Sequence, residues 1–155
     1  MGIKERRETA EEMFARLCSA LDEKKIDYDR DEEEFTVSFK IFGDDLPMRF
    51  TFKVNMHRQF MMVSSRLPFA VHEEKYTDMA LAACIATKVI PDGRFLFRPE
   101  LLRIDYRMSW HYRDSEMGDG FFSHLVDCAL STVEKYNDKF FSLNEGLIAL
   151  REFMK

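Results

Sequence analysis

The sequence predicts a two-layer α+β domain, with helices on one face of a mainly antiparallel, five-stranded sheet. Several segments alternate between apolar and polar residues, which is typical of strands with one buried face. An apolar helical segment separates the third strand from the fourth, and a long amphipathic segment follows the fifth. The expected order is therefore α-β-β-β-α-β-β-α, followed by a C-terminal helical extension.

A single domain is expected to span residues 1–155. A chain of this length buries about 70% of the surface of its unfolded state, which is enough for a core without disulfides. The composition is 46% apolar and 33% charged, as in a globular protein. We expect the core to span residues 9–140 and the helical extension to span residues 142–155.

The first helix is predicted to begin at Thr9. Thr9-Ala10-Glu11-Glu12 has the form of a capping box, in which the Glu12 side chain reaches back to the Thr9 amide. Residues 4–8 are then a frayed tail. The apolar residues that follow fall on one helical face, and they are Met13, Phe14, Leu17 and Leu21.

Residues 34–42, 48–56 and 60–67 are predicted to form three consecutive strands. In the first two, every second residue is apolar. The connections are too short for crossovers, so the three strands form an antiparallel meander. A very short additional strand is compatible with the sequence around residues 26–29, at the start of an acidic connection.

A helix at residues 76–90 is expected at the centre of the fold. Apolar residues cover almost its whole circumference, so it is buried on more than one side. The sheet covers one side, and either another helix or a second copy of the protein covers the other. The candidate dimer seam consists of Met79, Ala82, Ala83 and Ala86. A core within one chain explains these residues equally well.

The turn Pro91-Asp92-Gly93 ends this helix, because glycine permits a positive φ. Two strands follow, at residues 95–97 and 104–112. A long amphipathic helix is predicted at residues 121–141. Ser142-Leu143-Asn144-Glu145 then has the form of a second capping box, which predicts a last helix or a kinked continuation. Its predicted apolar side consists of Leu147, Leu150 and Met154.

The open face of the predicted sheet is basic, although the chain has a formal net charge of −5. The outward-facing cations are Lys40, Arg49, Lys53, Arg103 and Arg107. Asp105 and Glu34 are the main acids that oppose them. One interpretation is ordinary solvation of a sheet face, where lysine and arginine also discourage edge pairing. The other is that this face binds an acidic peptide or another anion.

Four segments have a recognisable form, and they are Leu67-Pro68, the helix 76–90, Pro91-Asp92-Gly93-Arg94-Phe95 and Ile104-Asp105-Tyr106-Arg107. Together with the order of elements, they resemble the YbjN family of bacterial proteins, which are described as sensory-transduction regulators. The resemblance covers residues 9–140. Family members often have an asparagine near the end of the central helix, whereas residues 83–88 contain none.

The resemblance implies a fold similar to that of type III secretion chaperones. It also implies a non-enzymatic, protein-binding or regulatory module that forms a homodimer. A dedicated type III secretion chaperone, which holds one effector in extended form, is the alternative. A third hypothesis, from another class, is a small enzyme with a site around Arg107, His111 and Ser65 on the open sheet face.

The remaining sequence features bear on the partners, the cellular location and the chemistry of the protein. A net negative charge argues against a nucleic-acid partner. The sequence has no apolar run of about 18 residues that predicts a membrane span, and no signal-peptide core, so we expect a cytoplasmic protein without a membrane partner. No catalytic motif is present. No pair with the spacing of metal ligands stands out among Cys18, Cys84, Cys128, His57, His72, His111 and His124. We therefore predict three buried thiols, no metal site and no cofactor.

Overall fold

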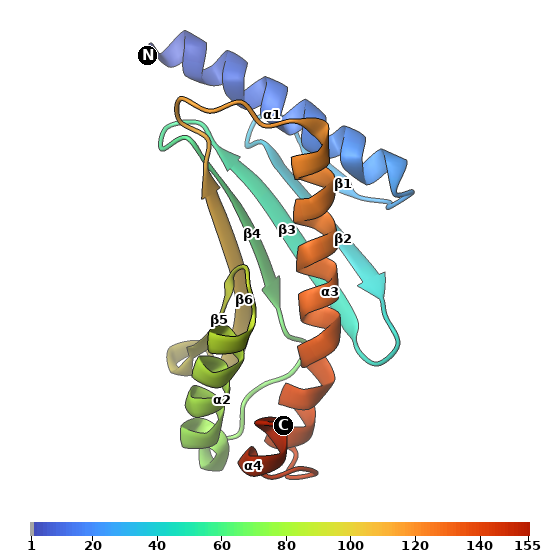
Figure 1. Ribbon diagram of the computed structural model, residues 1–155, viewed down its shortest axis with the longest axis vertical. Helices are drawn as coiled ribbons and strands as arrows, with labels where there is room; N and C mark the ends of the chain where they lie inside the picture. Colours follow the sequence, from blue (N-terminus) through green and yellow to red (C-terminus); the bar gives the residue numbers. More distant parts are fainter. Residues whose placement is uncertain (1) are drawn as a thin grey trace.

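The computed structural model describes residues 2–155 and confirms an α+β fold with an antiparallel sheet (Figure 1). The helices are α1 (Ile3–Glu23), α2 (Tyr76–Val89), α3 (Asp119–Asn144) and α4 (Leu150–Phe153). The strands are β1 (Asp29–Asp31), β2 (Thr36–Phe42), β3 (Pro47–Asn55), β4 (Phe60–Arg66), β5 (Arg94–Arg98) and β6 (Arg103–His111). Short 3-10 helices at Glu73–Lys75 and Pro99–Leu101 precede α2 and β6.

The sheet has six strands in the order β1-β2-β3-β4-β6-β5, where five were expected, and all neighbours are antiparallel. The additional strand is β1, which pairs with β2 through Arg30 opposite Val37. The Asp31 carboxylate accepts hydrogen bonds from the backbone amides of Glu33 and Glu34, each at 3.0 Å. This local turn folds the acidic connection back onto β2. The short strand that the sequence allowed around residues 26–29 therefore forms slightly later, at Asp29–Asp31, as an edge strand.

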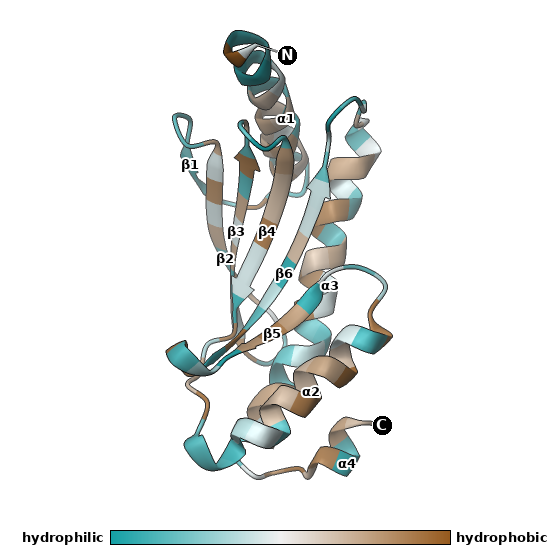
Figure 2. Cartoon of the chain, turned by 90° about the vertical axis from the view of Figure 1, so that its left-hand side faces the viewer, coloured by the Kyte–Doolittle hydropathy of each residue, from teal (hydrophilic) through white to brown (hydrophobic). Residues whose placement is uncertain are grey.

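The helices cover one face of the sheet, while the other face is open (Figures 1 and 2). Alternation along the strands directs one set of side chains toward α3, and Phe50, Phe52 and Tyr106 are fully buried there. Helix α1 lies across one end of this layer and packs against α3 and β3, whereas α2 packs against β5 at the other end. No helix in residues 2–155 is both long and apolar enough to cross a membrane.

Helix α1 begins at Ile3, so the predicted start at Thr9 is wrong. The Thr9 hydroxyl donates to the carbonyl of Glu5 at 2.9 Å, which places it within the helix. Glu12 accepts from Arg16 at 3.0 Å and does not cap a helix end. Residues 4–8, which were expected to fray, are helical. Arg7 forms an ion pair with Glu11, one helical turn later, with 3.2 Å between Nε and Oε1, and such a pair stabilises a helix.

The second predicted capping box also lies within a helix, because α3 continues through Ser142 to Asn144. Asn144 is buried, and its side chain bonds the segment before α2: it donates to the carbonyl of Ala70 at 2.9 Å and accepts from the amide of His72 at 3.0 Å. The predicted apolar side of the extension is corrected as well. Leu147 and Met154 are exposed, whereas Phe153 is buried against Phe140 with 4.9 Å between ring centroids.

Candidate functional site

Strand register determines which polar side chains lie together on the open face. Lys40 of β2 is directly opposite Arg49 of β3. Farther across the sheet, Ser64 of β4 is opposite Arg107 of β6, which is in turn opposite Arg94 of β5. Cations that are far apart in sequence therefore become lateral neighbours, as the alternation of the strands predicts.

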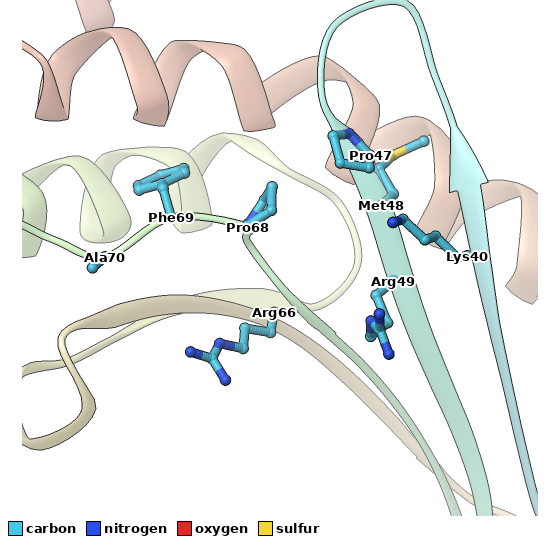
Figure 3. A pocket seen from close by; sticks show the side chains of 8 residues that line it. All are labelled: Lys40, Pro47, Met48, Arg49, Arg66, Pro68, Phe69 and Ala70. Carbon is cyan, nitrogen blue, oxygen red and sulfur yellow. The ribbon is translucent and has the colours of Figure 1, made fainter.

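The candidate site is a cleft of about 510 Å³ at the end of the open face where β3 begins and β4 ends (Figure 3). We call it the cationic cleft, and its three charged residues are Lys40, Arg49 and Arg66. Its other lining residues are Pro47, Met48, Pro68, Phe69 and Ala70. No acidic residue is among them. The cleft therefore combines three positive charges with a rim that includes two prolines.

Figure 3 shows that the Arg49 and Arg66 side chains extend from neighbouring strands, while the Phe69 ring points toward the helices. Phe69 makes an edge contact with Phe141 of α3, with ring centroids 5.7 Å apart. This contact fixes the segment that leaves β4 and hence the wall of the cleft. The two guanidinium groups are exposed, whereas the wall beside them is held by packing.

The three cations of the cleft have no acidic partner within residues 2–155. Lys40 lies over the Phe42 ring, with its ammonium nitrogen 5.0 Å from the ring centroid. Each guanidinium group of Arg49 and Arg66 presents five N–H donors in a planar fork that matches a carboxylate. The cleft thus offers unused donors to an anion.

Two of the predicted open-face cations are neutralised within the chain. Lys53 pairs with Glu34 at 3.4 Å. Arg103 donates to the Asp105 carboxylate at 2.9 and 3.1 Å, and Arg98 lies 3.6 Å from the same group. Asp105 was expected to face outward, but only 3% of its surface is exposed. Two arginines cover it, so this part of the face is a closed charge cluster.

Arg107, the fifth predicted cation, lies in a separate basic cleft of about 290 Å³ with Arg58, Arg94 and His111. The Nε atom of Arg107 is buried and has no hydrogen-bond partner. This second cleft is smaller than the cationic cleft, and its lining includes Phe60 and Met62. The predicted face therefore carries two basic clefts and two neutralised groups, which are the Lys53–Glu34 pair and the cluster around Asp105.

Sequence reasoning missed Arg66, which is the third cation of the cleft. The signal that could have identified it is the alternation of side-chain direction along β4. Every second residue is buried, at Val63, Ser65 and Leu67. Ser64 and Arg66 therefore face the open side. The polar residues at the end of this strand obscured that alternation.

The residues proposed for an enzymatic site are not brought together. Ser65 pairs with Tyr106 and faces the core, where 1% of its surface is exposed. Arg107 and His111 are on the open face, as part of the second cleft. A one-residue step along a strand reverses the side-chain direction, so Ser65 and Arg107 lie on opposite faces of the sheet.

The four residues of the predicted dimer seam all lie in the core: Met79, Ala82, Ala83 and Ala86 are at most 4% exposed. Their side chains pack against the chain's own sheet and helices, as the alternative interpretation allowed. The opposite side of α2 is exposed and partly apolar, with 46% exposure at Leu81 and 62% at Val89. Cys84 is also exposed there, which corrects the expectation that all three thiols are buried.

One group of side chains outside the open face has the composition of a metal site, although no metal site was predicted. Asp92, His124 and Cys128 each offer a ligand atom, and these atoms lie within 4.8 Å of one another. Burial raises the pKa of the Cys128 thiol, and the adjacent Asp92 carboxylate raises it further. Burial is also the main cause of the raised pKa of the nearby Tyr106 hydroxyl.

Two solved structures share this fold at low sequence identity. A chain in the crystal structure of the ExsC–ExsE complex matches with a TM-score of 0.59 and 12% identity, over 82% of this chain and 92% of that one. YbjN from E. coli matches with a TM-score of 0.56 and 9% identity, over 78% of this chain and 85% of YbjN.

The chain has a YbjN-like fold. This confirms the resemblance that the order of helices and strands along the chain and the turn after α2 indicated. Neither a protein-family model nor a curated protein sequence matches the chain. At identities of 9 and 12%, the two structures share the fold with this chain, and a shared fold does not imply a shared function.

Proposed function

We propose that this chain is a non-enzymatic protein-binding module that holds an acidic peptide segment of its partner in the cationic cleft. The observation that carries the proposal is the set of three exposed cations without acidic partners, gathered in a cleft that has no acidic lining. The proposed setting is the bacterial cytoplasm, in line with the YbjN-like fold and with three cysteines that are free thiols.

Charge complementarity favours an acidic peptide as the occupant. Arginine forms bidentate, charge-assisted hydrogen bonds with carboxylates, and these are stronger than neutral hydrogen bonds. The prolines on the rim provide apolar contacts to the segment between two acidic side chains. Because the chain as a whole is acidic, the cleft is a local positive region that orients an approaching anion.

Charge reversal within the cleft tests this proposal. A labelled peptide of alternating glutamate and serine is titrated with the full chain, and binding is followed by fluorescence anisotropy. We expect Arg49→Glu with Arg66→Glu to weaken binding at least tenfold. Raising the ionic strength from 0.1 to 1 M should weaken wild-type binding, because the Debye length falls from about 10 to about 3 Å.

The matched control is Lys4→Glu with Arg151→Glu, which changes the net charge equally at exposed positions on α1 and α4. We expect this control to bind the acidic peptide like the wild type, and a glutamine–serine peptide to bind neither protein. Equal loss of binding in both double variants would show that net charge alone attracts the peptide, which contradicts a specific cleft.

The proposal includes a homodimer in which exposed sides of α2 meet, because this helix carries large apolar side chains at Leu81 and Val89. Leu81→Glu should then yield a folded monomer by light scattering, where the wild type is a dimer. Ala83→Glu should instead unfold the chain, because a charge buried at this core position costs several kcal/mol. A wild-type monomer at all concentrations would contradict the dimer.

A dedicated secretion chaperone is the second candidate function. The match to a chain of the ExsC–ExsE complex, which covers 92% of that chain, favours it. In this case one effector is held in extended form along the open face. Affinity purification from the native host, followed by mass spectrometry, distinguishes the two candidates. A single client with an unfolded N-terminal segment supports the chaperone, whereas a folded partner with an acidic segment supports the binding module.

A further inference from the structure

Three side chains of different chemistry converge where the turn after α2 meets α3. Asp92 lies in the turn, whereas His124 and Cys128 lie four residues apart on α3 and therefore on one helical face. The carboxylate, imidazole and thiol atoms lie within 4.8 Å of one another. The thiol of Cys128 and the Oδ2 atom of Asp92 are 3.6 Å apart.

These distances are close to those of a tetrahedral zinc site. Zn–S and Zn–N or Zn–O bonds of about 2.3 and 2.0–2.2 Å place neighbouring ligand atoms about 3.3–3.8 Å apart. The sulfur–oxygen distance already falls within that range, and the other ligand atoms of the three side chains lie within 4.8 Å of one another. We propose that Asp92, His124 and Cys128 bind one Zn²⁺ ion, with water in the fourth position.

The charge around Asp92 supports a cation at this place. No lysine or arginine in residues 2–155 forms an ion pair with its carboxylate. The hydrogen-bond partner that the structure gives this carboxylate is the Cys128 thiol, which is a weak donor. A divalent cation neutralises the carboxylate and stabilises the thiolate that coordinates it.

The turn that carries Asp92 is held rigidly. The Tyr106 hydroxyl donates to the backbone carbonyl of Asp92 at 3.0 Å. Gly93 has a φ of +81°, and a side chain there would come within 2.6 Å of the Tyr106 hydroxyl and 2.7 Å of the Arg107 carbonyl. The turn is thus packed against β6, which positions the carboxylate before a metal arrives. Bound zinc would join the end of α2 to the first half of α3.

Metal titration of the full chain tests the site. After treatment with a chelator, the protein is titrated with Zn²⁺ by calorimetry, and Co²⁺ is used as a spectroscopic substitute. We expect one ion per chain with a Kd below about 10 μM, and a thiolate-to-cobalt absorption band. Cys128→Ser should abolish that band, and His124→Ala and Asp92→Asn should each weaken zinc binding at least about tenfold.

Cys84→Ser and His57→Ala are the matched controls, because both residues are exposed and lie outside the cluster. They should bind zinc like the wild type. His124→Ala is the decisive variant, since its side chain is exposed and its loss leaves the core intact. Wild-type stoichiometry well below one ion per chain, unchanged affinity in His124→Ala and Cys128→Ser, or loss of binding in Cys84→Ser would each overturn the proposal.

Discussion

Adjacent residues of β3 have opposite roles on the two faces of the sheet. Phe50 and Phe52 are fully buried on the core face, whereas Arg49 is exposed on the open face and Thr51 is partly exposed there. Each core residue has neighbours from other strands and helices, for example Phe39, whose ring centroid lies 5.5 Å from that of Phe50. The side chains of the core face are buried against other parts of the chain. The cations of the cleft are exposed and form no ion pair within residues 2–155, so they remain available to bind a partner.

Truncation on the core face should have the largest effect. Phe52→Ala removes a fully buried ring, so we expect the free energy of unfolding to fall by about 3–5 kcal/mol. Thr51→Ala, one residue away on the open face, should change it by less than about 1 kcal/mol. Urea denaturation followed by circular dichroism measures both. Similar losses for the two variants would show that the open face also contributes to the core.

The charge cluster around Asp105 should have an intermediate effect. Asp105→Ala leaves Arg103 and Arg98 without their shared acceptor, and we expect a loss of about 1–3 kcal/mol. It should also strengthen binding of the acidic peptide, because Arg103 becomes free on the open face, whereas Arg98 keeps its ion pair with Glu100 at 3.0 Å. Denaturation and anisotropy measurements on the same variant check the two results.

Glu34→Ala is the comparison for Asp105→Ala, because the Glu34 side chain is 67% exposed, whereas Asp105 is buried. We expect it to change stability by less than about 1 kcal/mol. If Asp105→Ala were equally mild, the cluster would be ordinary surface charge, and the division of the open face into neutralised and free regions would not hold.

The smallest effect on stability is expected within the cationic cleft. Arg49→Gln with Arg66→Gln, the neutral form of the double variant in the peptide test, breaks no ion pair within residues 2–155. It also avoids a second carboxylate opposite Asp105, the cross-strand partner of Arg66, so the free energy of unfolding should change by less than about 0.5 kcal/mol. A large loss of peptide binding without a loss of stability is the outcome that separates a functional surface from a structural one. A marked destabilisation would instead indicate that these arginines support the fold.

The sequence alone predicted the fold class, the antiparallel meander, the turn after α2 and the assignment of Lys40 and Arg49 to the open face. These features depend on local patterns: a period of two residues in strands, an apolar helical segment, and a glycine at a turn. The same local reasoning wrongly placed helix starts at Thr9 and Ser142. Both residues lie within helices, because the sequence pattern of a capping box also occurs in helix interiors.

Only the tertiary structure decided which charged residues are free. Arg66 joins Lys40 and Arg49 through the pairing of β2, β3 and β4, whereas the packing of Asp105 beneath Arg103 removes that arginine from the available set. The approach of Asp92 to His124 and Cys128 likewise depends on how the turn and α3 pack. Periodicity gives the direction of a side chain, but its neighbours depend on strand register and helix docking between distant segments.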